Sequence, residues 1–142
     1  MRILMIFLLL SVAVVAVAGM QREEIHGGVK ITFQTDAVTN PTGIVNVATA
    51  FVDALNRQDA KRALEFVHKG QQDTWKTYLA KTQEKHDLSL AGIVVFVGDY
   101  KIEGKRLRDQ QMARVKTEAK GGNGGMSFLM LMNADKWVVV ID

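Results

Sequence analysis

IVNVATAFVDAL, residues 44–55, places its apolar side chains at spacings of three and four residues. Such spacing brings them onto one side of an α-helix. The apolar positions are Ile44, Val47, Ala48, Phe51 and Leu55. Asn40 and Pro41 stand just before this stretch, and they suit an N-cap and a first helical turn. The sequence therefore predicts an amphipathic helix that ends at the polar residues 56–59.

Two shorter helices are predicted to follow. Asp59 is positioned to cap a second helix, which Gly70 ends. A third helix is predicted over residues 73–85. Its apolar side is formed by Trp75, Tyr78, Leu79 and Thr82.

After His86 the pattern changes from helix to strand. Strands are predicted at residues 93–102, 112–119, 126–132 and 137–141, with a turn at Gly104-Lys105 and a glycine hairpin loop at 121–125. Upstream of the helices, residues 29–34 alternate apolar and polar side chains, which predicts an edge strand. This order predicts an α+β fold of three N-terminal helices packed in a curled antiparallel sheet.

Two short motifs resemble the nuclear transport factor 2-like superfamily. VATAFVDAL at 47–55, followed by a polar break and ALEFV at 63–67, resembles its opening, and DKWVVVID at 135–142 resembles its ending. The likeness covers roughly residues 44–142 and is nearest to small exported bacterial domains of unknown function. It implies a cystatin-like cone with an apolar pocket. It implies no activity, because that fold hosts enzymes, binders and structural subunits.

The N-terminus is predicted to direct export. Arg2 precedes an uninterrupted run of apolar and small residues that ends in Ala16-Val17-Ala18, the pattern of a signal peptide and its cleavage site. An uncleaved membrane anchor over residues 1–19 is the alternative, since the run is just long enough to span a bilayer. Met20 stands where a lipoprotein would carry its lipidated cysteine. Residues 20–43 are predicted to be a tether, and the domain at 44–142 is expected to be periplasmic or extracellular, released or membrane-anchored.

Composition excludes several kinds of site. The 142 residues suit one domain, and the absence of cysteine excludes disulfides and thiolate metal sites. A net charge of +3 is too small to indicate a nucleic-acid partner. His26, His68 and His86 lie in separate segments without metal-ligand spacing. We therefore predict no metal, no cofactor and no nucleic acid.

Two predicted strands are apolar on both faces, at residues 93–97 and 128–132. A sheet covered by helices on one side should show polar residues on the other. The pattern predicts that a protein partner or a second copy of the chain, as in a homodimer, covers the outer face. Burial of both faces within one curled chain, partly under the 29–34 strand, is the alternative.

Aromatic and methionine side chains are the candidates for a ligand pocket, because they give stacking area and adapt to irregular ligands. The candidates are Trp75, Tyr78, Phe96, Tyr100, Met130 and Trp137. Side chains of these types at such spacings also fill ordinary cores, and that alternative stays open. The acid/base candidates for a pocket enzyme are Asp99, Tyr78, Tyr100 and His86. None is specific enough to assign as catalytic.

A basic cluster surrounds the predicted turn at residues 101–108. It consists of Lys101, Lys105, Arg106 and Arg108 and is interrupted by Glu103 and Asp109. Anionic headgroups or an acidic partner would fit it, and so would a solvated charge run that protects a strand edge.

The sequence favours a non-catalytic extracytoplasmic binding or accessory module that holds a small apolar ligand or a protein partner. A pocket enzyme of the isomerase or dehydratase type and a membrane-anchored structural subunit of an envelope complex are the alternatives.

Overall fold

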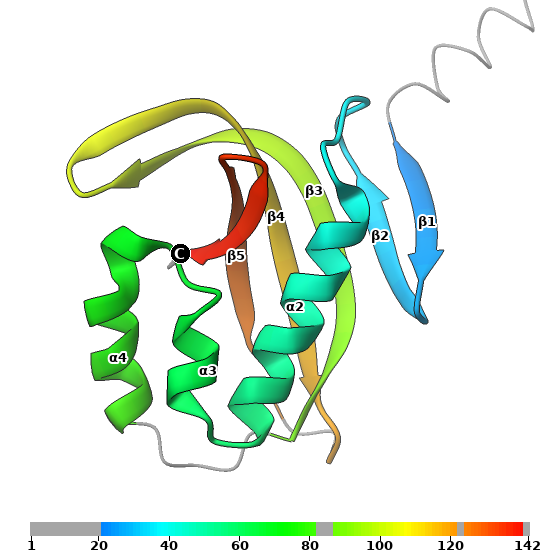
Figure 1. The fold of residues 1–142 in the computed structure, drawn as a ribbon. Helices are drawn as coiled ribbons and strands as arrows, with labels where there is room; N and C mark the ends of the chain where they lie inside the picture. The colour runs from blue at the N-terminus through cyan, green and yellow to red at the C-terminus, as the bar shows by residue number, and fades with distance from the viewer. Residues whose placement is uncertain (1–20, 82–86, 122–123, 141–142) are drawn as a thin grey trace, which may run out of the picture.

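A computed structural model describes residues 21–81, 87–121 and 124–140 of the chain. The predicted signal peptide or anchor at 1–19, the helix position Thr82, the candidate His86 and the strand end Ile141 lie outside these residues. Within them the fold is α+β, as the sequence predicts. A curved six-stranded sheet lies behind three helices, with α2 running along its inner face (Figure 1).

Helix α2 (Pro41–Asn56) confirms the helix predicted from residues 44–55. The Asn40 side chain accepts a hydrogen bond from the Gly43 amide at 3.2 Å, and Pro41 occupies the first turn. The spacing seen in the sequence becomes a buried stripe, in which Ile44, Ala48 and Phe51 have no exposed surface. Burial of this apolar side against the sheet is the main stabilisation of the helix.

Two short helices and a 3-10 turn complete the helical layer. Asp59 caps α3 (Ala60–Leu64) by accepting from the Arg62 amide at 3.0 Å. The turn η1 (Lys69–Gln71) leads directly into α4 (Gln72–Lys81). His68 caps η1, because its Nδ1 accepts from the Gly70 amide at 3.0 Å.

The sheet differs from the prediction in order and in direction. Its strands, in spatial as well as chain order, are β1 (Arg22–His26), β2 (Val29–Phe33), β3 (Leu88–Ile102), β4 (Lys105–Ala119), β5 (Ser127–Asn133) and β6 (Lys136–Val140). Two strands precede the helices, and β2 pairs parallel with β3. The helices are therefore not N-terminal, and the sheet is mixed rather than antiparallel.

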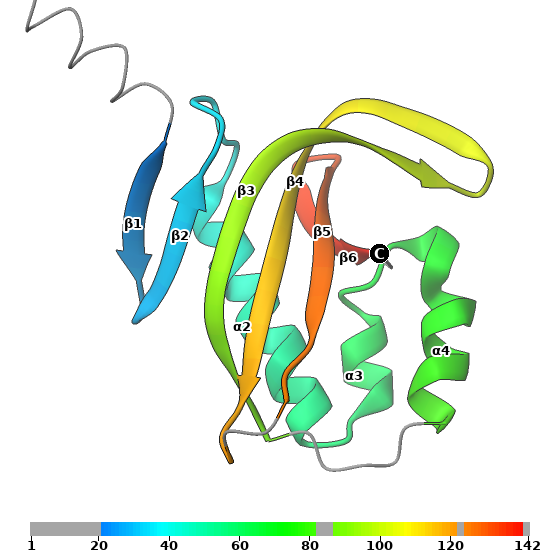
Figure 2. The ribbon, with the colours of Figure 1, turned by 180° about the vertical axis from the view of Figure 1, so that it is seen from behind.

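Strand β2 is not the edge that the sequence predicts. It lies between β1 and β3, and β1 takes the edge position (Figure 2). Val29, Ile31 and Phe33 are all buried in the main core. A strand that contributes three core side chains gains more from a partner on each side than from an open edge, which the short and charged β1 provides instead.

Part of the outer face of the sheet is covered by the chain itself. Residues 98–109 of the β3–β4 hairpin, called the arm below, curve away from the rest of the sheet (Figure 2). A bulge between Gly98 and Tyr100 starts the curve. The arm and the outer faces of β4, β5 and β6 share a second apolar cluster around Ile102, Met112, Leu129, Leu131 and Val140. Both faces of β5 are buried for this reason.

This second cluster affects the prediction that a partner or a second copy of the chain covers the outer face of the sheet. The apolar outer face of β5 was one of its two grounds, and the arm accounts for that face within one chain. On β3, Phe96 packs into the same cluster, whereas Val97 is 45% exposed. The 29–34 strand is not the cover, because its apolar side faces the other core. A homodimer or protein partner stays a prediction.

Trp137 joins the last strand to the start of the first helix. It lies on β6, and its Nε1–H donates to the carbonyl oxygens of Thr39 and Asn40 at 3.0 and 3.1 Å. These two residues lead into α2, so the indole connects the last strand to the start of the first helix. The outer edge of β6 is bonded as well, since the Val139 amide donates to the Phe66 carbonyl at 2.7 Å.

In the part of the chain that the structure describes, no helix has the length and apolar character needed to cross a membrane.

Candidate functional site: the cleft between α4 and β5

A cleft of about 330 Å³ lies between helix α4 and strands β5 and β6. We call it the α4–β5 cleft. It is lined by Thr74, Trp75, Tyr78, Met126, Ser127, Phe128 and Val140. Its volume is at the lower end of the range for small-molecule sites, and its walls are mainly aromatic and aliphatic, as such sites usually are.

Trp75 is the best-buried residue that α4 contributes to the cleft. Only 6% of it is exposed. Its ring packs at nearly right angles against Phe51 from α2, at a centroid distance of 5.4 Å, and against Tyr78 one turn later, at 5.5 Å. Edge-to-face pairs of this kind hold a ring in a defined orientation. The wall of the cleft is therefore a fixed aromatic surface.

The indole nitrogen of Trp75 has no hydrogen-bond acceptor. Among the described residues, Trp75 Nε1 is the one buried side-chain nitrogen or oxygen without a partner. Buried N–H groups without an acceptor are rare in folded proteins and require an explanation. The remaining polar groups at the cleft are the hydroxyls of Thr74, Tyr78 and Ser127. No charged side chain lines it within the described residues, so the cleft has the chemistry to hold a neutral ligand but not to transfer a proton through a carboxylate.

The six predicted pocket residues lie in three different places. Trp75 and Tyr78 line the α4–β5 cleft. Met130 and Trp137 are buried in the main core behind it. Phe96 and Tyr100 pack against the second cluster, on the opposite face of the sheet. The core interpretation holds for these last four residues.

The Asp99 side chain is hydrogen-bonded within the fold. Its carboxylate accepts from the Asp109 amide at 3.0 Å and from Arg106 Nη2 at 3.0 Å, and both partners belong to the arm. The backbone hydrogen bond from Asp109, followed by the bond from Arg106, lowers the pKa of Asp99. Asp109 has φ of 54°, so the carboxylate fixes the backbone of the bulge. Asp99 therefore holds the arm and lies outside the cleft lining.

Tyr100 and the basic cluster also lie outside the lining of the cleft. Tyr100 is at the arm, where its hydroxyl accepts from Gln71 Nε2 at 3.4 Å. The basic cluster of the sequence surrounds the arm turn, and Arg106 within it pairs with Asp99. No group of three or more histidine and acidic side chains is placed to hold a metal in the described part of the chain.

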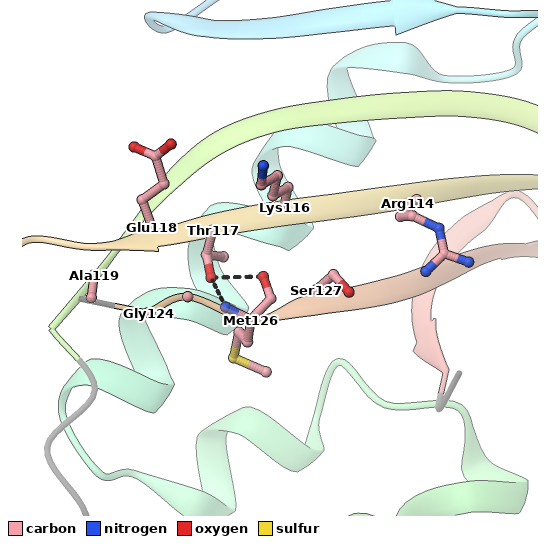
Figure 3. Close-up of a pocket in the computed structure, with 9 residues that line it drawn as sticks. Arg114, Lys116, Thr117, Glu118, Ala119, Gly124, Met126 and Ser127 are labelled. Carbon is pink, nitrogen blue, oxygen red and sulfur yellow. Dashed lines mark hydrogen bonds between the residues drawn. The ribbon is translucent and has the colours of Figure 1, made fainter. Parts of the chain in front are cut away.

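A second and larger hollow, of about 770 Å³, lies where β4 meets the start of β5 (Figure 3). Its central polar group is the buried Thr117. That hydroxyl accepts from the Met126 amide and donates to the Met126 carbonyl, both at 2.9 Å. Gly125 fits tightly here, since a Cβ would lie 2.2 Å from the Thr117 carbonyl oxygen. Thr117 thus fixes the chain before β5, and its bonds are used within the fold.

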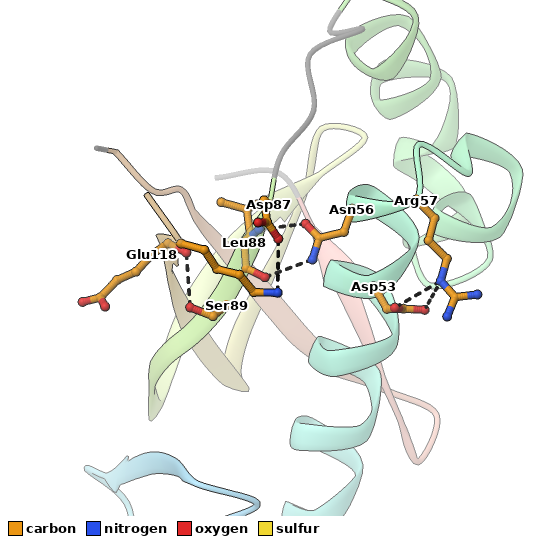
Figure 4. Close-up of polar contacts among 8 residues, drawn as sticks. Asp53, Asn56, Arg57, Asp87, Leu88, Ser89 and Glu118 are labelled. Carbon is orange, nitrogen blue, oxygen red and sulfur yellow. Dashed lines mark hydrogen bonds and ion pairs between the residues drawn. The ribbon is translucent and has the colours of Figure 1, made fainter. Parts of the chain in front are cut away.

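A polar contact also closes the far end of α2. The Asn56 side chain donates to the Leu88 carbonyl at 3.0 Å and accepts from the Leu88 amide at 2.8 Å (Figure 4). Nearby, Asp53 pairs with Arg57 on the exposed side of the helix. These contacts fix α2 against the start of β3 and offer no unpaired group to a ligand.

Sequence reasoning missed five of the lining residues. They are Thr74, Met126, Ser127, Phe128 and Val140. Thr74 and Ser127 are polar and therefore carry no pattern that marks a pocket. Phe128 was seen only as an apolar strand residue. The signal available in the sequence is the pair of aromatics, Trp75 and Tyr78, on a short helix of mainly polar residues.

No family model matches the sequence, and comparisons with curated proteins and with solved structures find no match. The resemblance to the nuclear transport factor 2-like superfamily stays a prediction.

Proposed function

We propose that this protein is a non-catalytic binding module, acting outside the cytoplasm, that holds a small apolar ligand in the α4–β5 cleft. The observation that carries the proposal is a cleft of about 330 Å³ whose walls are mainly aromatic and aliphatic and include the rings of Trp75, Tyr78 and Phe128. Export is supported by the signal-like pattern of residues 1–19, and a cone of the nuclear transport factor 2-like type is supported by helices packed inside a curved sheet.

The cleft suits binding better than chemistry. The acidic candidate Asp99 is committed to the arm, where Asp109 and Arg106 occupy its oxygens. The cleft lining offers hydroxyls and rings but no carboxylate or imidazole in the described residues. A general acid or base must reach the reacting proton within hydrogen-bond distance. No observation favours the enzyme or the envelope subunit over the binding module.

A test uses 2-ethylnaphthalene, an apolar probe of planar shape, in titration calorimetry with the protein. Ser127→Phe places a ring in the cleft from an exposed position on β5. Ser89→Phe is the matched control, an exposed serine of β3 outside the cleft lining. We expect saturable binding by the wild type and the control, and an affinity at least tenfold lower for Ser127→Phe. Equal affinities for the two variants would exclude the cleft as the binding site.

A further inference from the structure

The α4–β5 cleft adjoins the hollow of about 770 Å³ at the start of β5, which we call the β4 hollow. Met126 and Ser127 line both of them. We infer that the natural ligand is an amphipathic oxyanion. Its apolar body occupies the cleft, and its carboxylate or phosphate head lies in the β4 hollow beside Lys116 and Arg114. The inference rests on the proposed function of the cleft and adds the chemical class of the ligand.

Strand register places the two cationic side chains next to the cleft. Lys116 lies directly opposite Ser127. Arg114 lies opposite Leu129, and Leu129 lies opposite Val140 on the next strand. Residues that stand directly opposite each other project from the same face of a sheet. Since Ser127 and Val140 line the cleft, each cation belongs to a short row of side chains that starts at the cleft.

The two cations are accessible to a ligand. Lys116 and Arg114 are both exposed, and both line the β4 hollow. Figure 3 shows the Arg114 side chain extending toward β5. Lys116 forms no ion pair with another described residue. An oxyanion in the hollow therefore pairs with Lys116 without breaking an existing ion pair of that lysine.

One acidic side chain, Glu118, also lines the β4 hollow in the described part of the chain. It lies opposite Ser89 on β3, past the point where β5 begins to pair with β4. In Figure 3 it extends away from Ser127. The border that the hollow shares with the cleft is therefore cationic.

The α4 border of the cleft carries the opposite charge. Thr74 and Tyr78 line the cleft and also a hollow along α4, to which Asp73 contributes. Like charges repel, so an anionic head is disfavoured beside Asp73 and favoured beside Lys116. The two borders therefore orient an anionic amphiphile with its head toward β4.

The division between cleft and hollow also suits the solvation of such a ligand. No charged side chain lines the cleft within the described residues, so its walls match an apolar body that gains by leaving water. Burying an ionised head among them would be costly. Beside the exposed Lys116 and Arg114 the head keeps part of its water and avoids that cost. An amphiphile thus satisfies both regions at once.

The test compares two probes of nearly equal size in titration calorimetry, 4-(2-naphthyl)butanoate and its neutral primary amide. We expect the wild-type protein to bind the carboxylate about fivefold more tightly at low ionic strength, the combined effect of two exposed charge pairs. Added salt should reduce this preference, because it screens exposed charges. The phosphate monoester of 3-(2-naphthyl)propanol is measured beside them. A preference over the amide for either oxyanion supports the inference, and the tighter of the two identifies the head.

A charge reversal locates the head. In Lys116→Glu the ratio of carboxylate to amide affinity should fall to about one or below, while the affinity for the amide stays within about twofold of wild type. The matched control is Lys101→Glu, at an exposed lysine of the arm outside both linings. It should keep the wild-type ratio. Unchanged binding of the amide shows that the variant is folded with its cleft intact.

Nuclear magnetic resonance of ¹⁵N-labelled protein reports the orientation. Both probes should move the backbone amide signal of Phe128, which lines the cleft. The carboxylate alone should also move the signals of Lys116 and Ser127. If it moves the signal of Thr74 instead, the head lies at the α4 border and the inference is wrong.

The outcomes separate the two proposals. Equal affinities for the carboxylate, the phosphate and the amide overturn the oxyanion inference and leave the binding function standing. Binding of none of the probes overturns both. A preference for the carboxylate that persists in Lys116→Glu also overturns the inference, because the charge would then be recognised elsewhere.

Discussion

Trp137 and Trp75 are buried almost equally, with 3% and 6% of their surfaces exposed, yet their indole nitrogens are treated differently. Trp137 donates to two backbone carbonyl oxygens, whereas Trp75 donates to no described acceptor. Burial alone therefore does not decide whether the polar atom of a side chain is bonded within the fold.

The surroundings of the two rings agree with this difference. Trp137 sits on β6, the last strand of the sheet, and bonds residues almost a hundred positions away, so it ties this strand to the start of α2. Trp75 sits on α4, a helix at the border of the molecule whose neighbours in the chain fold are α3 and η1 (Figure 1). Substitutions at these two residues and at the arm test this difference.

The largest loss of stability is expected for Trp137→Ala. The substitution removes a fully packed ring from the core and both of its hydrogen bonds, so the free energy of unfolding should fall by about 3–5 kcal/mol. Urea unfolding followed by circular dichroism measures it. Tyr78→Ala, at a half-exposed ring, is the control and should lose about 1 kcal/mol or less. Similar losses for the two variants would mean that Trp137 does not anchor the fold.

A smaller effect is expected from the matched pair Trp137→Phe and Trp75→Phe. Both keep an aromatic ring, so they differ mainly in the N–H that is lost. Trp137→Phe breaks two bonds, whereas Trp75→Phe removes an unpaired donor. The first variant should therefore be less stable than the second by about 1–2 kcal/mol. If Trp75→Phe is the less stable variant, its N–H has a partner in solution, and the contrast between the two residues is wrong.

The smallest effect is expected for Asp99→Asn, which loosens the arm. Asp99 has a folded pKa below its unfolded value of about 3.9, so its charge contributes stability above that pH and loses it as the pH falls through the folded pKa. Wild type should melt slightly higher than the variant at pH 6. The difference should close below about pH 4. A difference that does not vary with pH would show that the carboxylate charge does not hold the bulge.

Asp99→Asn also tests whether the arm and the α4–β5 cleft are coupled. Val140 belongs to the cluster under the arm and also lines the cleft beside Trp75. Loosening the arm should therefore shift the indole N–H signal of Trp75, in NMR spectra of ¹⁵N-labelled protein, more than that of Trp137. An equal shift of the two signals would count against a local effect.

The sequence predicts the elements of this fold well and their partners poorly. The spacing from Ile44 to Leu55 gave the main helix, since one turn of helix is a local property. Alternation at 29–34 indicated a strand, but no local pattern says that Ile31 pairs parallel with Ile93, because that choice depends on contacts made across the whole chain. Tertiary packing decides such pairings.

The site was predicted in part for the same reason. Trp75 and Tyr78 were identified because aromatics on a short polar helix stand out. Phe96 and Tyr100 lie on the outer face instead. Phe96 follows the core residue Val95, so strand alternation alone turns it outward, whereas Tyr100 comes after the bulge that begins the arm. A single extra residue in a strand changes which face a side chain joins, and the sequence around Gly98 does not reveal on which strand it occurs.

The parallel pairing of β2 with β3 also sets an order of events during synthesis. Residue 31 leaves the ribosome, or a translocation channel, 62 positions before residue 93, its partner in the sheet. Until then the N-terminal hairpin has no neighbour to dock on, and Val29, Ile31 and Phe33 have no core to enter. Pairing between such distant positions is slow to form. The β1–β2 hairpin therefore joins the sheet only after β3 has been made, although the hairpin itself is a local pairing.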